Sequence, residues 1–204
     1  MAVIEGIEIQ HIGHSGFRIM HESKAICIDP FKAPKGGPAD IILITHEHFD
    51  HCDEDSVERL RKESTTIIGP AGVKAKLQGV TVISAGGQKV IGDIAIEAVP
   101  AYNRNKPYHP KGLGVGYVIT IDGRRIYHAG DTDRIPEMKS LGSIDIALLP
   151  VSGTYTMTAE EAAAAANEDI RPKAAVPMHY GVITGSKSDA EKFKRLCNCE
   201  VTII

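Results

Sequence analysis

The segment "ITHEHFDHCD", residues 44–53, decides how this sequence is interpreted. It directly follows the apolar run 41–43, which predicts a short buried strand with the polar residues at its end. In an extended backbone His46 and His48 point to the same side, whereas helical residues two apart diverge by about 200°. Burying so many polar side chains without partners would cost several kcal/mol. The segment therefore predicts a metal site at a strand end, with four candidate ligands: His46, His48, Asp50 and His51.

Two later segments also place metal-binding side chains after predicted strands. "YHAGDTD" carries Asp131 after a strand over 125–128, and "VPMHYG" carries His179 after a strand over 174–177. Imidazole and carboxylate ligands suit zinc, manganese or iron. We therefore predict that Asp131 and His179 complete the same site.

Length and charge set the broad class. At 204 residues we predict a single domain over 1–204, large enough to bury roughly 70% of its unfolded surface. The formal charge of −3 gives no support to nucleic-acid binding, which depends on basic surfaces. Because the sequence has neither a signal-peptide pattern nor a long apolar stretch, we expect a cytoplasmic protein with no membrane partner. The four cysteines are expected to be reduced, and the sequence leaves open whether the chain forms a homo-oligomer.

The periodicity predicts the fold class. Short alternating strands at 7–12, 17–21 and 25–28 precede a helix that Asp53 is expected to cap, and a hairpin over 114–128 turns at Asp122-Gly123. Strands and helices then alternate, with helices over 158–167 and 188–196 and a last strand over 200–204. The capping box Thr158-x-x-Glu161 opens the first of these helices. We predict an α+β protein: a four-layer αββα sandwich of two mixed β-sheets with outer helices.

The ordered motifs resemble those of a known family. "HEHFDH", "HAGDT" and "PMHYG", preceded by "HIGHSGFRI" and "CIDP", resemble the metallo-β-lactamase superfamily. The resemblance is to its small metal-dependent hydrolases related to ascorbate 6-phosphate lactonase and N-acyl phosphatidylethanolamine phospholipase D. It implies the same sandwich with two divalent metal ions at one edge, zinc first and manganese or iron as alternatives. It also implies that His46 and His48 hold one ion, that Asp50, His51 and His179 hold the other, and that Asp131 bridges them.

One expected ligand is missing from its usual place. Relatives carry a third histidine for the first ion in the pattern P-A-x-H, whereas "VPAYN" has Asn103 there. We predict that His109, six residues further along a polar loop, replaces it. Two alternatives stay open: a His109 that contacts substrate beside a weakened first metal, and an ordinary loop histidine.

Supporting residues follow from the need to orient each ligand imidazole through its other nitrogen. Asp29 is expected to bond a ligand histidine, and His128 to support Asp131. His14 is expected to contact substrate, to support a ligand or to be structural. His11 and His21 are assigned no function.

The resemblance and the ligand set together predict a hydrolase for a small substrate. Two adjacent metals lower the pKa of a shared water, and the resulting hydroxide would attack an ester, lactone or phosphodiester. The predicted catalytic residues are Asp50, Asp131 and His14. The leaving group would be stabilised by His14, His109 or Tyr180.

The cations Arg104, Lys106 and Lys111 flank His109, so they favour a phosphorylated substrate if they border the site, and they are otherwise a solvated loop. The alternatives to a hydrolase are an iron-dependent oxidoreductase on the same fold and a non-catalytic metal-binding protein. Metal content and a substrate panel would distinguish them.

Overall fold

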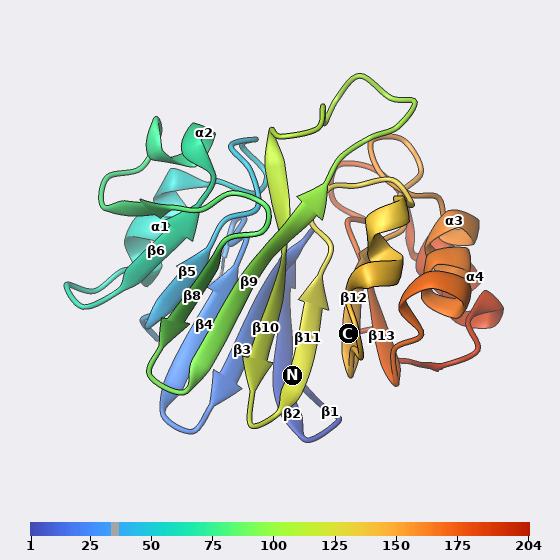
Figure 1. The fold of residues 1–204 in the computed structure, drawn as a ribbon, viewed down its shortest axis with the longest axis horizontal. Coiled ribbons are helices and arrows are strands. Elements are labelled where there is room, and N and C mark those ends of the chain that lie inside the picture. Colours follow the sequence, from blue (N-terminus) through green and yellow to red (C-terminus); the bar gives the residue numbers. More distant parts are fainter. Residues whose placement is uncertain (34–36) are drawn as a thin grey trace.

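The computed structural model describes residues 1–33 and 37–204, and within them two seven-stranded sheets face each other (Figure 1). The first sheet follows the chain in order: β1 (Ala2–Ile4), β2 (Ile7–Gly13), β3 (Gly16–His21), β4 (Lys24–Ile28), β5 (Ile41–Leu43), β6 (Thr66–Gly69) and β7 (Val80–Val82). The second sheet does the same: β8 (Gln88–Ile91), β9 (Ile94–Ala101), β10 (Gly114–Ile121), β11 (Arg124–His128), β12 (Ile146–Pro150), β13 (Ala174–Met178) and β14 (Glu200–Val201).

Both sheets have the same pairing plan. The first four strands of each pair antiparallel, and the fourth then pairs parallel with the fifth, as do the strands that follow. The carboxyl ends of parallel strands meet at one edge of a sheet. In the first sheet this edge carries the loops after β4 and β5, and in the second sheet it carries the loops after β11 and β13. The two sets of loops lie at a common edge of the sandwich.

The main core lies between the sheets. Ile19 and Ile26 of the first sheet and Ile119 and Ile126 of the second are completely buried in one hydrophobic cluster. Tyr117 on β10 is also buried, and its hydroxyl donates a hydrogen bond to the Ile44 carbonyl at 2.8 Å. This bond fixes the second sheet against the backbone that leads into the histidine-rich segment.

Helices form the two outer layers, as Figure 1 shows. The helices α1 (Glu54–Leu60) and α2 (Ala71–Lys74) pack Val57 and Val73 into a second cluster with Ile42 and Ile67 of the first sheet. On the other side, α3 (Ala159–Ala164) and α4 (Lys187–Leu196) bury Ala162 and Phe193 with the second sheet, and the 3₁₀ helix η1 (Pro136–Ser140) precedes β12. The predicted αββα sandwich of two mixed sheets is confirmed.

Two predicted boundaries are wrong. The capping box at α3 is present, with the Glu161 N–H donating to Thr158 Oγ1 at 3.1 Å and the Thr158 N–H to Glu161 Oε2 at 2.8 Å. The winding then continues beyond residue 167 as the π-helix η2 (Ala165–Ile170), because the alanine-rich segment has no helix breaker before Pro172. The last strand covers residues 200–201 rather than 200–204.

Over residues 1–33 and 37–204, no helix is both long enough and apolar enough to cross a bilayer.

Candidate metal centre

The loop after β5 brings its four predicted ligands together. The N–H groups of His51 and Cys52 both donate to the His48 carbonyl, at 3.0 and 2.8 Å, which folds the segment into a tight turn. His46 Nε2 then lies 3.0 Å from His48 Nδ1. His51 Nε2 lies 3.8 Å from Asp50 Oδ2.

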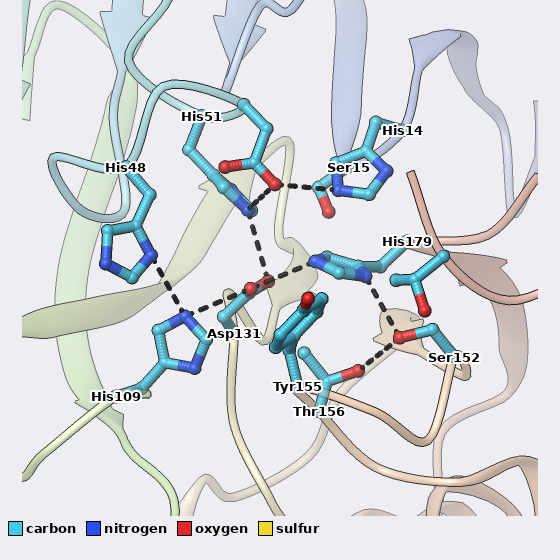
Figure 2. Close-up of polar contacts among 12 residues, drawn as sticks. His14, Ser15, His48, His51, His109, Asp131, Ser152, Tyr155, Thr156 and His179 are labelled. Atoms are coloured by element: carbon cyan, nitrogen blue, oxygen red, sulfur yellow. Dashed lines mark hydrogen bonds and ion pairs between the residues drawn. The ribbon is translucent and has the colours of Figure 1, made fainter. Parts of the chain in front are cut away.

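The second sheet adds three side chains from three separate loops (Figure 2). His109, in the β9–β10 loop, places Nε2 3.2 Å from His48 Nδ1 and 3.3 Å from Asp131 Oδ2. Asp131 follows β11, and its two oxygens lie 3.3 Å from His51 Nε2 and 3.0 Å from His179 Nε2. The structure therefore brings His109 back to the cluster, and Asp131 lies at its centre.

The potential ligand atoms form overlapping groups, each with all atoms within 4.8 Å of one another. These groups are His46, His48 and His109; His46, His51 and Asp131; and His14, Asp50, His51 and His179. The first contains the three ligands predicted for one metal, the last contains the three predicted for the other together with His14, and the middle group contains the predicted bridging carboxylate.

Unpartnered polar atoms show that this cluster fits cations. His51 Nε2, Asp131 Oδ1 and His179 Nε2 are buried and have no hydrogen-bond partner. Buried polar atoms are normally hydrogen-bonded, so three such atoms facing one another require a further partner. Imidazole nitrogens and carboxylate oxygens are the donors that zinc, manganese and iron accept. The residues present therefore fit divalent metal ions.

Asp29, at the end of β4, orients the first-sheet side of the cluster. Its Oδ2 accepts hydrogen bonds from His51 Nδ1 at 2.7 Å and from the Thr45 hydroxyl at 2.6 Å, and its Oδ1 accepts from the Thr45 N–H at 2.7 Å. A proton on His51 Nδ1 leaves Nε2 with its lone pair toward the cluster. The expected hydrogen bond between Asp29 and a histidine of the cluster is present.

Asn103 performs the same task for His109. The Asn103 side-chain oxygen accepts from His109 Nδ1 and from the His109 backbone N–H, both at 3.0 Å. Its amide nitrogen donates to Asp133 Oδ1 at 3.0 Å and to the Tyr155 carbonyl at 2.9 Å, which fixes the orientation of the amide. Sequence reasoning identified Asn103 only as a lost ligand. It missed that the Asn103 side chain orients His109 and leaves the His109 Nε2 atom facing His48 and Asp131.

His14 is fully buried, and its Nε2 lies 3.1 Å from Asp50 Oδ2. Of the three roles considered for His14, this contact favours support of Asp50, and His14 is not among the described residues that line the cavity described below. The His14 carbonyl also accepts the His179 N–H at 2.9 Å. A residue that sequence reasoning missed, Ser152, lies 3.1 Å from His179 Nδ1 through its hydroxyl.

Three of the eight non-glycine residues with positive φ in the described part of the chain lie at the cluster. His14, Asp29 and His179 have φ angles of 52°, 43° and 59°, in the left-handed region that residues with side chains rarely occupy. Each such conformation costs about 1 to 3 kcal/mol and persists only where the surroundings enforce it. The hydrogen bonds of these residues supply that constraint.

Of the remaining histidines, His128 supports the turn before Asp131, as expected. Its Nε2 donates to the Ser15 carbonyl at 2.9 Å, and its Nδ1 accepts the Gly130 N–H at 3.2 Å.

Burial and neighbouring charges shift the pKa values of the potential ligands in opposite directions. Burial holds the pKa of His46 well below its usual value. Burial also opposes charge on Asp131, but His179 and His51 outweigh it and hold the pKa of that carboxyl well below its usual range. For His51, burial is outweighed by Asp131 and Asp29, which raise its pKa well above the ordinary value.

The cluster opens into a cavity of about 260 Å³. Five of the predicted site residues line it together with four aromatic or aliphatic side chains that sequence reasoning missed: His48, Asp50, His109, Asp131 and His179, with Phe49, Tyr108, Tyr155 and Ile183. The tyrosine proposed for the leaving group, Tyr180, is not among them.

The structure favours the alternative in which the cations flanking His109 lie in a loop away from the cavity. Lys106 Nζ lies 2.5 Å from Asp133 Oδ1, and Lys111 Nζ lies 2.9 Å from Glu137 Oε1. Neither these lysines nor Arg104 is among the described residues that line the cavity. Carboxylates in the segment after β11 attract the lysines away from it.

Two glycines of the second sheet allow the close approach of the histidine-rich segment. A Cβ atom at Gly114 would lie 2.9 Å from His46 Cβ, and one at Gly130 would lie 3.3 Å from Thr45 Cβ. Gly130 also has a φ of +64°, which disfavours other residues.

A family model described as the beta-lactamase superfamily domain matches residues 8–179. Together with the fold and the ligand cluster, this match shows that the chain belongs to the β-lactamase superfamily, in its metallo-β-lactamase fold. It is 36% identical to a UPF0173 metal-dependent hydrolase of Thermococcus onnurineus over 97% of this chain and 95% of that one.

Solved structures of similar sequence have the same fold. A Parabacteroides distasonis protein shares 39% identity over 97% of this chain and 92% of its own, with a TM-score of 0.89. Igni18, a metallo hydrolase from Ignicoccus hospitalis, shares 27% identity over 97% and 94%, with a TM-score of 0.80.

Proposed function

We propose that this protein is a metal-dependent hydrolase that uses two divalent cations to cleave an ester, lactone or phosphodiester bond in a small substrate. The observation that carries the proposal is the convergence of His51 Nε2, Asp131 Oδ1 and His179 Nε2, all buried and without hydrogen-bond partners. The hydrolase names of the relative from Thermococcus onnurineus and of Igni18 support the reaction class. Zinc is the first candidate, with manganese and iron as alternatives.

The assignment of ligands follows the groups of converging atoms. His46, His48 and His109 would hold one ion, and Asp50, His51 and His179 the other, with Asp131 between them. When bound, such ions lower the pKa of water and polarise the bond that is attacked.

The carboxylate of Asp131 has the central role among the side chains. Its Oδ2 faces His109 and His179, whereas its Oδ1 has no hydrogen-bond partner. Oδ1 can therefore accept a hydrogen bond from the attacking water and orient it toward the substrate.

Two residues act through their neighbours. His14 fixes Asp50, through a contact of 3.1 Å that holds the carboxylate toward the cavity. Asn103 fixes His109 in the tautomer whose Nε2 is free. Both are positioning residues, since neither lines the cavity.

The test begins with metal content. Protein purified without chelator is analysed for metals, and esters, lactones and phosphodiesters are then assayed with the ion found. We expect roughly two divalent ions per chain, and turnover that a chelator abolishes and the ion restores. Protein that neither retains nor takes up divalent ions would overturn the proposal. A coloured or paramagnetic iron protein without hydrolytic turnover would favour the oxidoreductase alternative.

A further inference from the structure

The outer wall of the cavity is apolar, although its floor consists of potential ligands. Phe49, Tyr108 and Ile183 line it and keep 65%, 45% and 41% of their surfaces exposed. Single exposed apolar residues are common on soluble proteins. These three belong to loops far apart in the sequence, yet they meet at one opening, and such gathering marks a binding surface.

Contacts behind the wall hold these rings in place. Tyr108 packs edge-to-face on Tyr155, with ring centroids 4.7 Å apart at 85°, and Phe49 packs on Phe31 at 6.0 Å and 77°. The Tyr155 carbonyl also accepts a hydrogen bond from Asn103, which orients His109. Figure 2 shows the Tyr155 ring beside Asp131 and His179. The apolar wall and the ligand cluster are therefore joined in one framework.

The cavity wall provides no cation for a charged group away from the ligands. Of the described residues that line the cavity, the only ionisable ones besides the two tyrosines are the five potential ligands. Lys106 and Lys111, the nearest cations in sequence, are paired with Asp133 and Glu137. An anionic substituent packed against this wall would give up part of its hydration without gaining a cationic side chain as a partner.

We propose that the substrate carries an uncharged apolar group next to the bond that is cleaved, and that this group packs against Phe49, Tyr108, Tyr155 and Ile183. The proposal rests on the hydrolase function and names its substrate class. An engineered apolar cavity of about 150 Å³ binds benzene, so a cavity of about 260 Å³ accommodates one aromatic ring or a short alkyl chain beside the reacting group. The substrate is thus distinguished from molecules such as sugar phosphates, in which the part next to the reacting group is polar or anionic rather than apolar.

The binding test does not depend on turnover. Signals of isoleucine methyl groups are followed by NMR in the metal-loaded protein while benzyl alcohol or glycerol is added, with the Ile183 signal assigned through Ile183→Val. We expect benzyl alcohol, but not glycerol, to shift the Ile183 signal in a saturable manner. No shift with benzyl alcohol, or equal shifts with both, would overturn the proposal. A shift that follows protein concentration instead would identify the wall as a contact between copies of the chain and would also overturn it.

The kinetic test uses matched neighbouring residues. Val182 is 54% exposed and does not line the cavity, whereas Ile183 does. Across acetate, butyrate and hexanoate esters of one alcohol, kcat/KM should rise by up to about fourfold per buried methylene. Ile183→Ser should flatten this rise and Val182→Ser should leave it intact.

A half-ester of adipate, in which a carboxylate replaces the terminal methyl group of the hexanoate chain, should be cleaved more slowly than the hexanoate ester. Equal rates across the series would overturn the substrate class while leaving the hydrolase function standing. Failure to cleave any ester, lactone or phosphodiester would count against the hydrolase function, and the NMR titration would still decide whether the wall binds an apolar group.

Discussion

The two sheets have the same pairing plan but contribute to the metal centre in different ways. After β5, the first sheet presents four potential ligands within six consecutive residues. The second presents His109, Asp131 and His179 from three loops separated by more than twenty residues each. The first half therefore encodes its part of the site locally, whereas the second half has its ligands brought together only by the fold.

This difference indicates which substitutions should disturb the metal centre most in each half of the chain. In the first half, one buried carboxylate, Asp29, supports the whole ligand segment through Thr45 and His51. In the second half each ligand has its own support: Asn103 for His109, His128 behind the turn to Asp131, and Ser152 beside His179. Substitutions in the two halves should accordingly differ in how far their effects spread.

The largest effect is expected at the residue that joins the halves. Asp131→Ala removes the carboxylate that contacts His51 of the first half and His109 and His179 of the second. We expect hydrolysis to fall to background and metal content to drop, measured by steady-state assay and elemental analysis. The control is Asp55→Ala, which removes an exposed carboxylate from the first turn of α1. Retained activity in Asp131→Ala would show that the halves act independently.

Asp29→Ala should come next, because it leaves several buried donors without a partner. We expect the free energy of unfolding of the metal-free protein to fall by about 3 kcal/mol or more. Affinity for metal should fall by about 10- to 100-fold. Denaturant unfolding and metal titration measure the two effects, with Asp29→Asn as the milder comparison. If the substitution lowers the affinity for only one of the two ions, Asp29 supports a single metal position, as each supporting residue of the second half is expected to do.

Asn103→Ala should have a narrower effect. His109 loses the acceptor that fixes its tautomer, so affinity for the ion at His46, His48 and His109 should fall by about 10- to 100-fold. The ion at Asp50, His51 and His179 should be retained. Titration with a spectroscopically visible divalent ion would resolve the two, and Asn105→Ala, in an exposed part of the same loop, is the control. An equal loss at both positions would contradict separate supports in the second half.

The smallest effect concerns the cysteines, which also differ between the halves. Burial raises the pKa of Cys27 to about 11 and that of Cys52 to about 12. The neighbouring Cys197 thiol lowers the pKa of the half-buried Cys199 below its usual value. Since the thiolate is the reactive form, iodoacetamide labelling of Cys199 in the folded protein should begin at a lower pH than labelling of an unperturbed cysteine. Mass spectrometry would locate the label, and Cys27 and Cys52 should react only after unfolding.

The same contrast explains how much could be predicted from the sequence. The segment 46–51, the strand periodicity and the capping box at Thr158 are local signals, and they were sufficient for the sandwich and for the position of the cluster. Asp29 could be predicted because it ends a strand next to the site. The end of η2 was missed because a π-helical turn has no distinct sequence pattern.

What could not be predicted depends on long-range contacts. The role of Asn103 depends on Asp133 and Tyr155, which lie 30 and 52 residues away and hold its amide in one orientation. The position of the cations near His109 was left open for a similar reason, since their partners Asp133 and Glu137 lie in the segment after β11. The apolar wall could not be identified because Phe49, Tyr108, Tyr155 and Ile183 share no motif and meet only in space.

The bare backbone at Gly114 and Gly130 also limits how this protein can diverge. With a methyl group at Gly114 only 2.9 Å from His46 Cβ, nothing larger than hydrogen fits beneath the histidine-rich turn. New substrate specificities are therefore expected to arise by substitution of residues at the opening of the cavity, around Phe49 and Ile183. Gly114 and Gly130 should stay unchanged in related proteins that still bind metal ions.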